Sequence, residues 1–111
     1  MKKIFLISIL MAIVSLTKSQ CVYSVQYKSD ADVKVYVAQY KSDADLVIYK
    51  CAYKSDAEVN NGLWYFVNYS SDAKKKIYFV EYKSEADLII YFADYKSDAG
   101  WQNASKKALM Y

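Results

Sequence analysis

The chain contains no histidine, and this absence limits the chemistry that it can perform. Histidine is the usual general base of enzymes and the commonest metal ligand. Without it, neither a Cys–His nor a Ser–His pair can activate a nucleophile. The carboxylates recur at regular intervals, whereas a glycosidase needs one buried pair at a defined separation. We therefore expect a protein that is not an enzyme and has no catalytic residue.

Arginine and proline are also absent, and glycine occurs only twice. Without arginine, the chain has no guanidinium fork to bind phosphate or carboxylate in a bidentate way. The run Lys74–Lys76 is more typical of a solvated turn than of the clustered basic surface of a nucleic-acid-binding protein. The composition therefore predicts no nucleic-acid partner.

Two cysteines are too few for a disulfide framework. Relative to the repeat described below, Cys21 and Cys51 are offset by four residues. In neighbouring in-register strands this offset is ~13 Å, which is beyond disulfide reach. We expect Cys51 to be a small core residue and Cys21 a free thiol, although antiparallel or looped-back strands would allow them to pair.

Residues 1–19 have the layout of a cleaved secretory signal. Two lysines precede an apolar run, Ile4–Leu16, and the small residues Thr17 and Ser19 occupy positions −3 and −1 of a cut before Gln20. The run is shorter than the ~20 residues that span a bilayer, so an uncleaved anchor is the weaker alternative. The mature chain would carry twelve lysines and twelve acidic residues. We expect it to be secreted, to the periplasm or the extracellular space, with no membrane span.

One hexapeptide, Tyr27–Asp32 (YKSDAD), recurs through the rest of the chain. Further copies begin at Tyr40, Tyr53, Tyr69, Tyr82 and Tyr95, at spacings of 13, 13, 16, 13 and 13 residues. A second tyrosine precedes each copy by four residues: Tyr23, Tyr36, Tyr49, Tyr65, Tyr78 and Tyr91. The 16-residue spacing contains an inserted turn signal, Asn60-Asn61-Gly62. A fixed period of this kind indicates a repeat architecture.

The segments between the hexapeptides are rich in Val, Ile, Tyr and Phe and are too short for helices. Their residues alternate with period two, which predicts six strands. Ser and Asp of the hexapeptide are turn residues, because their side chains accept hydrogen bonds from backbone N–H groups one or two residues on.

We expect these strands to form an all-β fold. A connection of four or five residues can join antiparallel neighbours but cannot cross over to a parallel strand in the same sheet. The pattern therefore favours an up-and-down antiparallel meander, closed or nearly closed into a barrel so that no long edge is exposed. The alternative is a β-roll or solenoid of stacked repeats.

One face of the predicted strands is aliphatic and aromatic, and the other alternates tyrosine with small residues. We expect the first to form the core, since branched and aromatic carbons leave no polar atom unsatisfied. Its members are Val33, Val35, Leu46, Ile48, Trp64, Phe66, Ile77, Phe79, Leu88, Ile90 and Phe92. Residues 20–111 make one domain. Within its cap, residues 101–111, we expect a helical turn or two over 105–111 and Trp101 as a plug of the core.

The YKSDAD units, the segment LWYF after the inserted turn and the ending AGWQNASKK resemble a family of small secreted repeat proteins of unknown function. Its members come from bacteria, especially gliding and gut lineages, and from some invertebrates. The resemblance covers residues 21–111 and supports the limits of the domain. It implies no activity.

Two features of the repeat are candidate binding sites. Aromatic rows on a secreted protein can stack on sugar rings or pack against a partner, although they also serve as cross-strand pairs. The binding residues would then be Tyr27, Tyr40, Tyr53, Tyr69, Tyr82 and Tyr95. The acidic-Ala-acidic spacing offers oxygen ligands for calcium, although Ser and Asp also simply build turns. The metal ligands would be Asp30, Asp32, Asp43, Asp45, Asp56, Glu58, Glu85 and Asp87.

The sequence thus predicts a secreted, non-enzymatic binding or adhesion module whose tyrosine-rich face contacts a glycan or a surface protein. A self-assembling structural protein of the extracellular space and a calcium-stabilised β-roll are the alternatives. No organic cofactor is expected, and calcium is the one candidate ion.

Overall fold

A computed structural model describes residues 20–57 and 60–111 of the chain. The predicted signal, residues 1–19, lies outside the described residues. The strands are β1 (Cys21–Ser24), β2 (Val33–Val37), β3 (Leu46–Lys50), β4 (Leu63–Phe66), β5 (Lys75–Phe79), β6 (Leu88–Phe92) and β7 (Gly100–Trp101). Each hexapeptide forms a short 3-10 helix: η1 (Lys28–Asp30), η2 (Lys41–Asp43), η3 (Lys54–Asp56), η4 (Ser70–Asp72), η5 (Lys83–Glu85) and η6 (Lys96–Asp98). A last 3-10 helix, η7 (Ala104–Met110), ends the chain.

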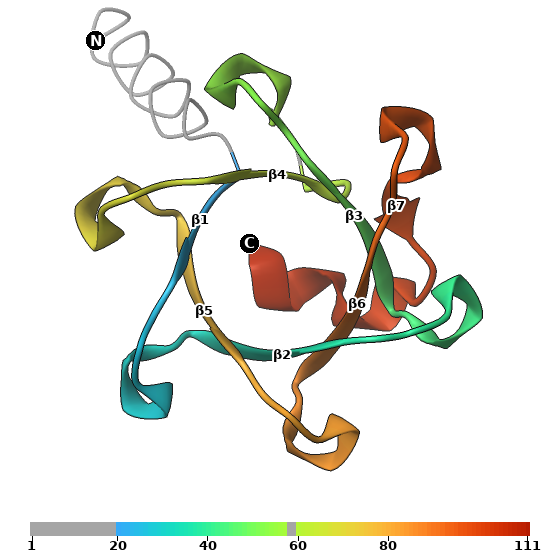
Figure 1. The fold of residues 1–111 in the computed structure, drawn as a ribbon, viewed down its shortest axis with the longest axis horizontal. Helices are drawn as coiled ribbons and strands as arrows, with labels where there is room; N and C mark the ends of the chain where they lie inside the picture. The colour runs from blue at the N-terminus through green and yellow to red at the C-terminus, as the bar shows by residue number, and fades with distance from the viewer. Residues whose placement is uncertain (1–19, 58–59) are drawn as a thin grey trace, which may run out of the picture.

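Six strands close into a barrel in the order β4-β1-β5-β2-β6-β3, and β3 also pairs with β4 (Figure 1). All these pairings are parallel. The strand β7 joins β3 in the antiparallel sense. The all-β repeat barrel is confirmed, but the predicted antiparallel meander is wrong, and the structure is not the β-roll given as the alternative.

The chain passes around the barrel twice. Strands β1, β2 and β3 form the first circuit and strands β4, β5 and β6 the second, whose strands lie between those of the first. Strand β5 lies between β1 and β2, and β6 lies between β2 and β3. Strand β4 follows β3 directly, without a strand between them. This one shorter step coincides with the inserted turn at residues 60–62. The insertion therefore sets the offset between the two circuits.

Short connections can join these parallel strands because each strand begins at the level along the barrel axis where the previous one ends. Ser24, the last residue of β1, pairs with Ile77 of β5, and Val33, the first residue of β2, pairs with the same Ile77 from the other side. The chain has to step over one strand but not to travel back along it. The prediction of antiparallel neighbours failed because it assumed a full return path.

Each hexapeptide loop spans one strand of the other circuit, in an arrangement that we call a clip. Val25 N–H donates to Ile77 C=O at 2.8 Å on one side of β5, and Asp32 N–H donates to Lys76 C=O at 2.8 Å on the other. The loops after β2, β4 and β5 clip β6, β1 and β2 in the same way. Two strand spacings are about 10 Å, which a loop of this length crosses easily.

The turn chemistry differs in part from the expectation. In every clip the backbone closes the 3-10 turn, as when Asp30 N–H donates to Tyr27 C=O at 3.0 Å. The second carboxylate of the hexapeptide bonds to the clipped strand instead of to its own turn. Asp32 Oδ2 accepts from Lys76 N–H at 2.9 Å, and Asp87 Oδ2 accepts from Lys34 N–H at 3.0 Å.

The predicted apolar face forms the core. Eight of its residues are buried, with at most 2% of their surface exposed: Val33, Val35, Leu46, Ile48, Trp64, Ile77, Leu88 and Ile90. Phe66 and Phe92 pack against this cluster, and Lys50 Nζ lies 5.4 and 4.8 Å from their ring centroids. Phe79 is the exception, because 37% of it is exposed.

The C-terminal segment enters the barrel (Figure 1). The helix η7 confirms the predicted turn over residues 105–111, and Met110 is fully buried in the core cluster. Gln20 is itself buried and donates from Nε2 to Met110 C=O at 3.0 Å. Trp101 packs against the core, and its Nε1 donates to Asn60 C=O at 3.0 Å. Both ends of the described chain are thus held by the barrel.

Gly62 provides a test of the inserted turn. Its φ is +91°, and a Cβ there would collide with Val47 C=O and lie 3.0 Å from Gly100 N. We expect Gly62→Ala to lower the free energy of unfolding by about 1–3 kcal/mol from the backbone strain alone, and further from the collision, as measured by chemical denaturation.

Gly100→Ala is the matched control, because Gly100 also has a positive φ, +153°, but open space where its Cβ would lie. The collision predicts the larger loss for Gly62→Ala. Equal losses for the two variants would contradict it.

Candidate functional site

The six tyrosines that begin the hexapeptides are the most exposed aromatic residues of the repeat. Their exposed fractions lie between 62% and 71%. Each precedes one of the helices η1–η6, in loops that project outward around the barrel (Figure 1). The six tyrosines four residues upstream lie on the strands and are half-buried. The predicted binding residues are therefore displayed around the whole perimeter of the barrel.

Neighbouring loops enclose hollows that contain these tyrosines. Hollow A measures about 340 Å³ and lies between the loops of η1 and η4. Its lining residues are Tyr23, Val25, Gln26, Tyr27, Asp30, Ser70 and Lys76. Hollow B measures about 170 Å³ and lies between the loops of η2 and η5. Its lining residues are Tyr36, Ala38, Gln39, Tyr40, Asp43, Lys83 and Ile89.

The two hollows are the same site in two copies. Every residue of hollow B follows its counterpart in hollow A by 13 residues, in both segments of the chain that contribute. Each hollow therefore combines a half-buried tyrosine, an exposed glutamine, an exposed tyrosine and an aspartate from one repeat with residues of the other circuit.

Acidic and basic side chains of adjacent loops meet around the perimeter. Glu85 Oε1 lies 3.2 Å from Lys28 Nζ, and Asp56 Oδ1 lies 3.7 Å from Lys96 Nζ. Both pairs are solvent-exposed, and such pairs contribute only ~0–1 kcal/mol to stability. In each pair, the first acidic residue of one hexapeptide faces the lysine of the loop beside it on the barrel.

Hollow A departs from this pattern, because Ser70 stands where the other hexapeptides have lysine. Lys76 lines hollow A at the position that Ile89 has in hollow B. A lysine of the strand thus takes the place of the missing lysine of the loop. Each hollow contains one carboxylate and one ammonium group, so their formal charges cancel.

The residues predicted as metal ligands do not converge. The described residues contain no group of three or more His, Cys, Asp or Glu side chains that could hold a metal ion. Asp32, Asp45 and Asp87 each bond to a backbone N–H of a clipped strand. Asp56 and Glu85 instead face lysines of other loops. Of the rest, Asp30 and Asp43 lie apart, in hollows A and B, and Glu58 lies outside the described residues.

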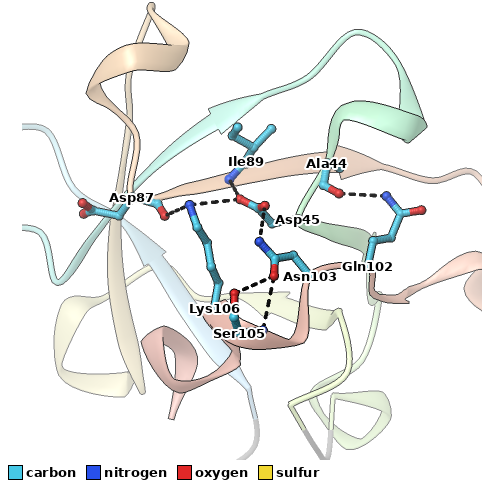
Figure 2. Close-up of polar contacts among 8 residues, drawn as sticks. All are labelled: Ala44, Asp45, Asp87, Ile89, Gln102, Asn103, Ser105 and Lys106. Carbon is cyan, nitrogen blue, oxygen red and sulfur yellow. Dashed lines mark hydrogen bonds and ion pairs between the residues drawn. The ribbon is translucent and has the colours of Figure 1, made fainter.

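Asp45 holds the C-terminal segment against the barrel (Figure 2). Its Oδ2 accepts from Ile89 N–H at 2.9 Å and lies 3.5 Å from Lys106 Nζ, while its Oδ1 accepts from Asn103 Nδ2 at 3.2 Å. Lys106 Nζ also donates to Asp87 C=O at 3.0 Å. The carboxylate therefore joins β6 to the segment that leads into η7, which is a structural role.

The cysteines are both buried and free. Cys51 is a small buried residue, as expected, with 8% of its surface exposed. Burial raises the pKa of the Cys51 thiol, and the Asp56 carboxylate raises this pKa further, while Lys96 acts in the opposite direction. A raised pKa keeps the thiol protonated and therefore a poor nucleophile.

Within residues 20–57 and 60–111, no helix is long and apolar enough to cross a bilayer.

The clipped, doubly wound path agrees with a comparison to known families. A family model described as the 7(1) septoil knot domain matches residues 19–102. The chain belongs to the septoil knot domain family. The description names a knot, and knotted folds are rare among proteins. No curated protein and no solved structure matches the chain.

Sequence reasoning found the tyrosines of this septoil knot domain but not the hollows beside them. Gln26 and Lys76 were not proposed as binding residues, because they lie 50 residues apart in the sequence. The signal that connects them is that both segments lining hollow A recur 13 residues later in hollow B. It becomes visible only when the strand order is known.

Asp45 and Asp32 occupy the same position in their hexapeptides and allow a matched comparison. Asp45→Ala removes the acceptor of Ile89 N–H and Asn103 Nδ2 in a nearly buried place. We expect it to lower the free energy of unfolding by about 2–4 kcal/mol. Asp32→Ala removes one exposed bond, to Lys76 N–H, and should cost about 1 kcal/mol. Chemical denaturation measures both, and equal losses would show that the C-terminal contacts add nothing.

The dispersed carboxylates also lead to a prediction about calcium. A ligand that binds only the folded state raises the melting temperature by mass action. We expect the same melting temperature in chelator and in millimolar calcium. A rise with calcium concentration, removed by chelator, would restore the acidic turns as a metal site.

Proposed function

We propose that this protein is a secreted, non-enzymatic binding module, and that its repeat tyrosines contact a glycan or a protein on a cell surface. The observation that carries the proposal is the ring of six tyrosines, each at least 62% exposed, at the start of every hexapeptide loop. A tyrosine ring combines a large apolar face with a polar hydroxyl, and for this reason tyrosine is enriched in binding surfaces.

The local backbone gives each tyrosine a fixed position. The tyrosine precedes a 3-10 turn whose own backbone bonds close it, as when Asp43 N–H donates to Tyr40 C=O at 3.1 Å. The clip then fixes the loop on both sides of a strand, through Ala38 N–H and Asp45 N–H. A preorganised aromatic contact loses little conformational freedom when it binds, which supports affinity.

Self-assembly through open sheet edges receives less support. In the described residues each of the six barrel strands has hydrogen-bonded neighbours on both sides. Edge pairing between copies needs unpaired backbone groups, which a closed barrel does not offer. The loops are the part of the molecule that extends away from it (Figure 1).

The test measures binding of the fluorescently labelled protein to intact bacterial and animal cells. The double variant Tyr27→Ser, Tyr40→Ser removes two aromatic contacts and should lower cell binding at least tenfold, while circular dichroism shows the fold retained. Periodate treatment of the cells should abolish binding if the partner is a glycan, and protease treatment if it is a protein.

Tyr111→Ser is the matched control, because Tyr111 is 64% exposed but lies outside the repeat. It should bind as the wild type does. If the double variant also binds as the wild type does, the tyrosines are not the contact and the proposal fails.

A further inference from the structure

We infer that hollows A and B are two equivalent binding sites, each of which takes one residue of a neutral oligosaccharide. The inference rests on the proposed function and specifies its ligand. It also adds residues to the site, since Asp30 and Asp43 take part as acceptors and Gln26 and Gln39 as amide donors and acceptors.

The size of the hollows supports a small ligand. Sites for small molecules measure ~300–1,000 Å³ and combine apolar or aromatic walls with a few polar groups. Hollow A, at about 340 Å³, lies at the lower end of this range, and hollow B, at about 170 Å³, is smaller still. Spaces of this size admit a single ring rather than a folded surface.

The chemistry of the lining is that of sugar recognition. The exposed ring of Tyr27 offers an apolar face with a polar end, which suits the C–H face of a pyranose. Asp30 can accept from two neighbouring hydroxyls, and the Gln26 amide can both donate and accept. Tyr40, Asp43 and Gln39 repeat these groups in hollow B.

Charge then selects among sugars. Asp30 and Lys76 line hollow A, while Asp43 and Lys83 line hollow B. Each hollow therefore has no formal net charge, although its lysine comes from a strand in one case and from a loop in the other. A charged sugar would meet one like and one opposite charge, and so would gain no net attraction to offset the cost of desolvating its own charge. A neutral ligand is therefore favoured.

At two other junctions between loops, an ion pair occupies the corresponding place. Asp56 and Glu85 occupy the same repeat position as Asp30 and Asp43, but lysines lie 3.7 and 3.2 Å from their carboxylates. A lysine ammonium group of the protein therefore already lies beside each of these two carboxylates. Asp56 therefore provides a matched control for the two hollows.

Isothermal titration calorimetry tests the inference on the purified protein. The probes are cellohexaose and mannohexaose as neutral sugars, a galacturonic acid hexamer as the anionic one and a glucosamine hexamer as the cationic one. We expect at least one neutral hexamer to bind with two sites per chain, and both charged hexamers to bind it at least tenfold more weakly.

Three single variants locate the sites. Asp30→Asn and Asp43→Asn should each reduce the stoichiometry from two to one, and the double variant should abolish binding. Asp56→Asn should leave two sites. Each change keeps the shape of the side chain, and the melting temperature of each variant confirms its folding.

Several outcomes would overturn the inference: no neutral hexamer binds, the charged hexamers bind as tightly as the neutral ones, or Asp56→Asn has the effect of Asp30→Asn. The proposed function fails separately. Tyrosine-dependent, protease-sensitive binding to cells would keep it while the sugar sites are rejected, whereas tyrosine-independent binding to cells would reject it.

Discussion

The fold depends on one backbone arrangement, the clip, in which a loop hydrogen-bonds on both sides of a strand that comes from elsewhere in the chain. Two N–H groups of the loop supply the bonds, and in three copies a carboxylate adds a third from the opposite direction. Because the clipped strand belongs to the other circuit, every clip joins segments far apart in the sequence. The closed barrel, the buried core and the outward position of the loops all follow from it.

The sequence predicted the parts of this structure that a single repeat encodes. Period-two alternation identified Leu46 and Ile48 as core residues, and both are fully buried. The strand direction could not be predicted in this way, since it depends on pairings such as Asp32 with Lys76, 44 residues apart. A single 13-residue unit, one strand followed by one turn, is equally compatible with an antiparallel meander and with the parallel barrel. The insertion at Asn60–Gly62 was recognised as a turn, but its effect on the offset between circuits is a property of the whole ring.

In the candidate site, too, one part is encoded by a single repeat and another part depends on the closed barrel. Exposure of the repeat tyrosines follows from their position at the start of a turn, which the sequence contains. The hollows combine groups from both circuits, and Ser70 and Lys76 have no visible relation to Asp30 until the ring is closed. Repeated carboxylates suggested a metal because their spacing is regular. In the structure the second acid of the hexapeptide is used to hold a neighbouring strand, which explains its recurrence without an ion.

Closure has a consequence for how such proteins can change over evolutionary time. An open solenoid can gain or lose units at its ends, because each unit contacts only its neighbours. Here the strands of one circuit fill the gaps of the other, and β4 completes the ring between β3 and β1. Duplicating or deleting a single unit would shift every later strand out of its gap. The number of repeats is therefore fixed by geometry, and variation is confined to substitutions within each unit, such as the serine at position 70.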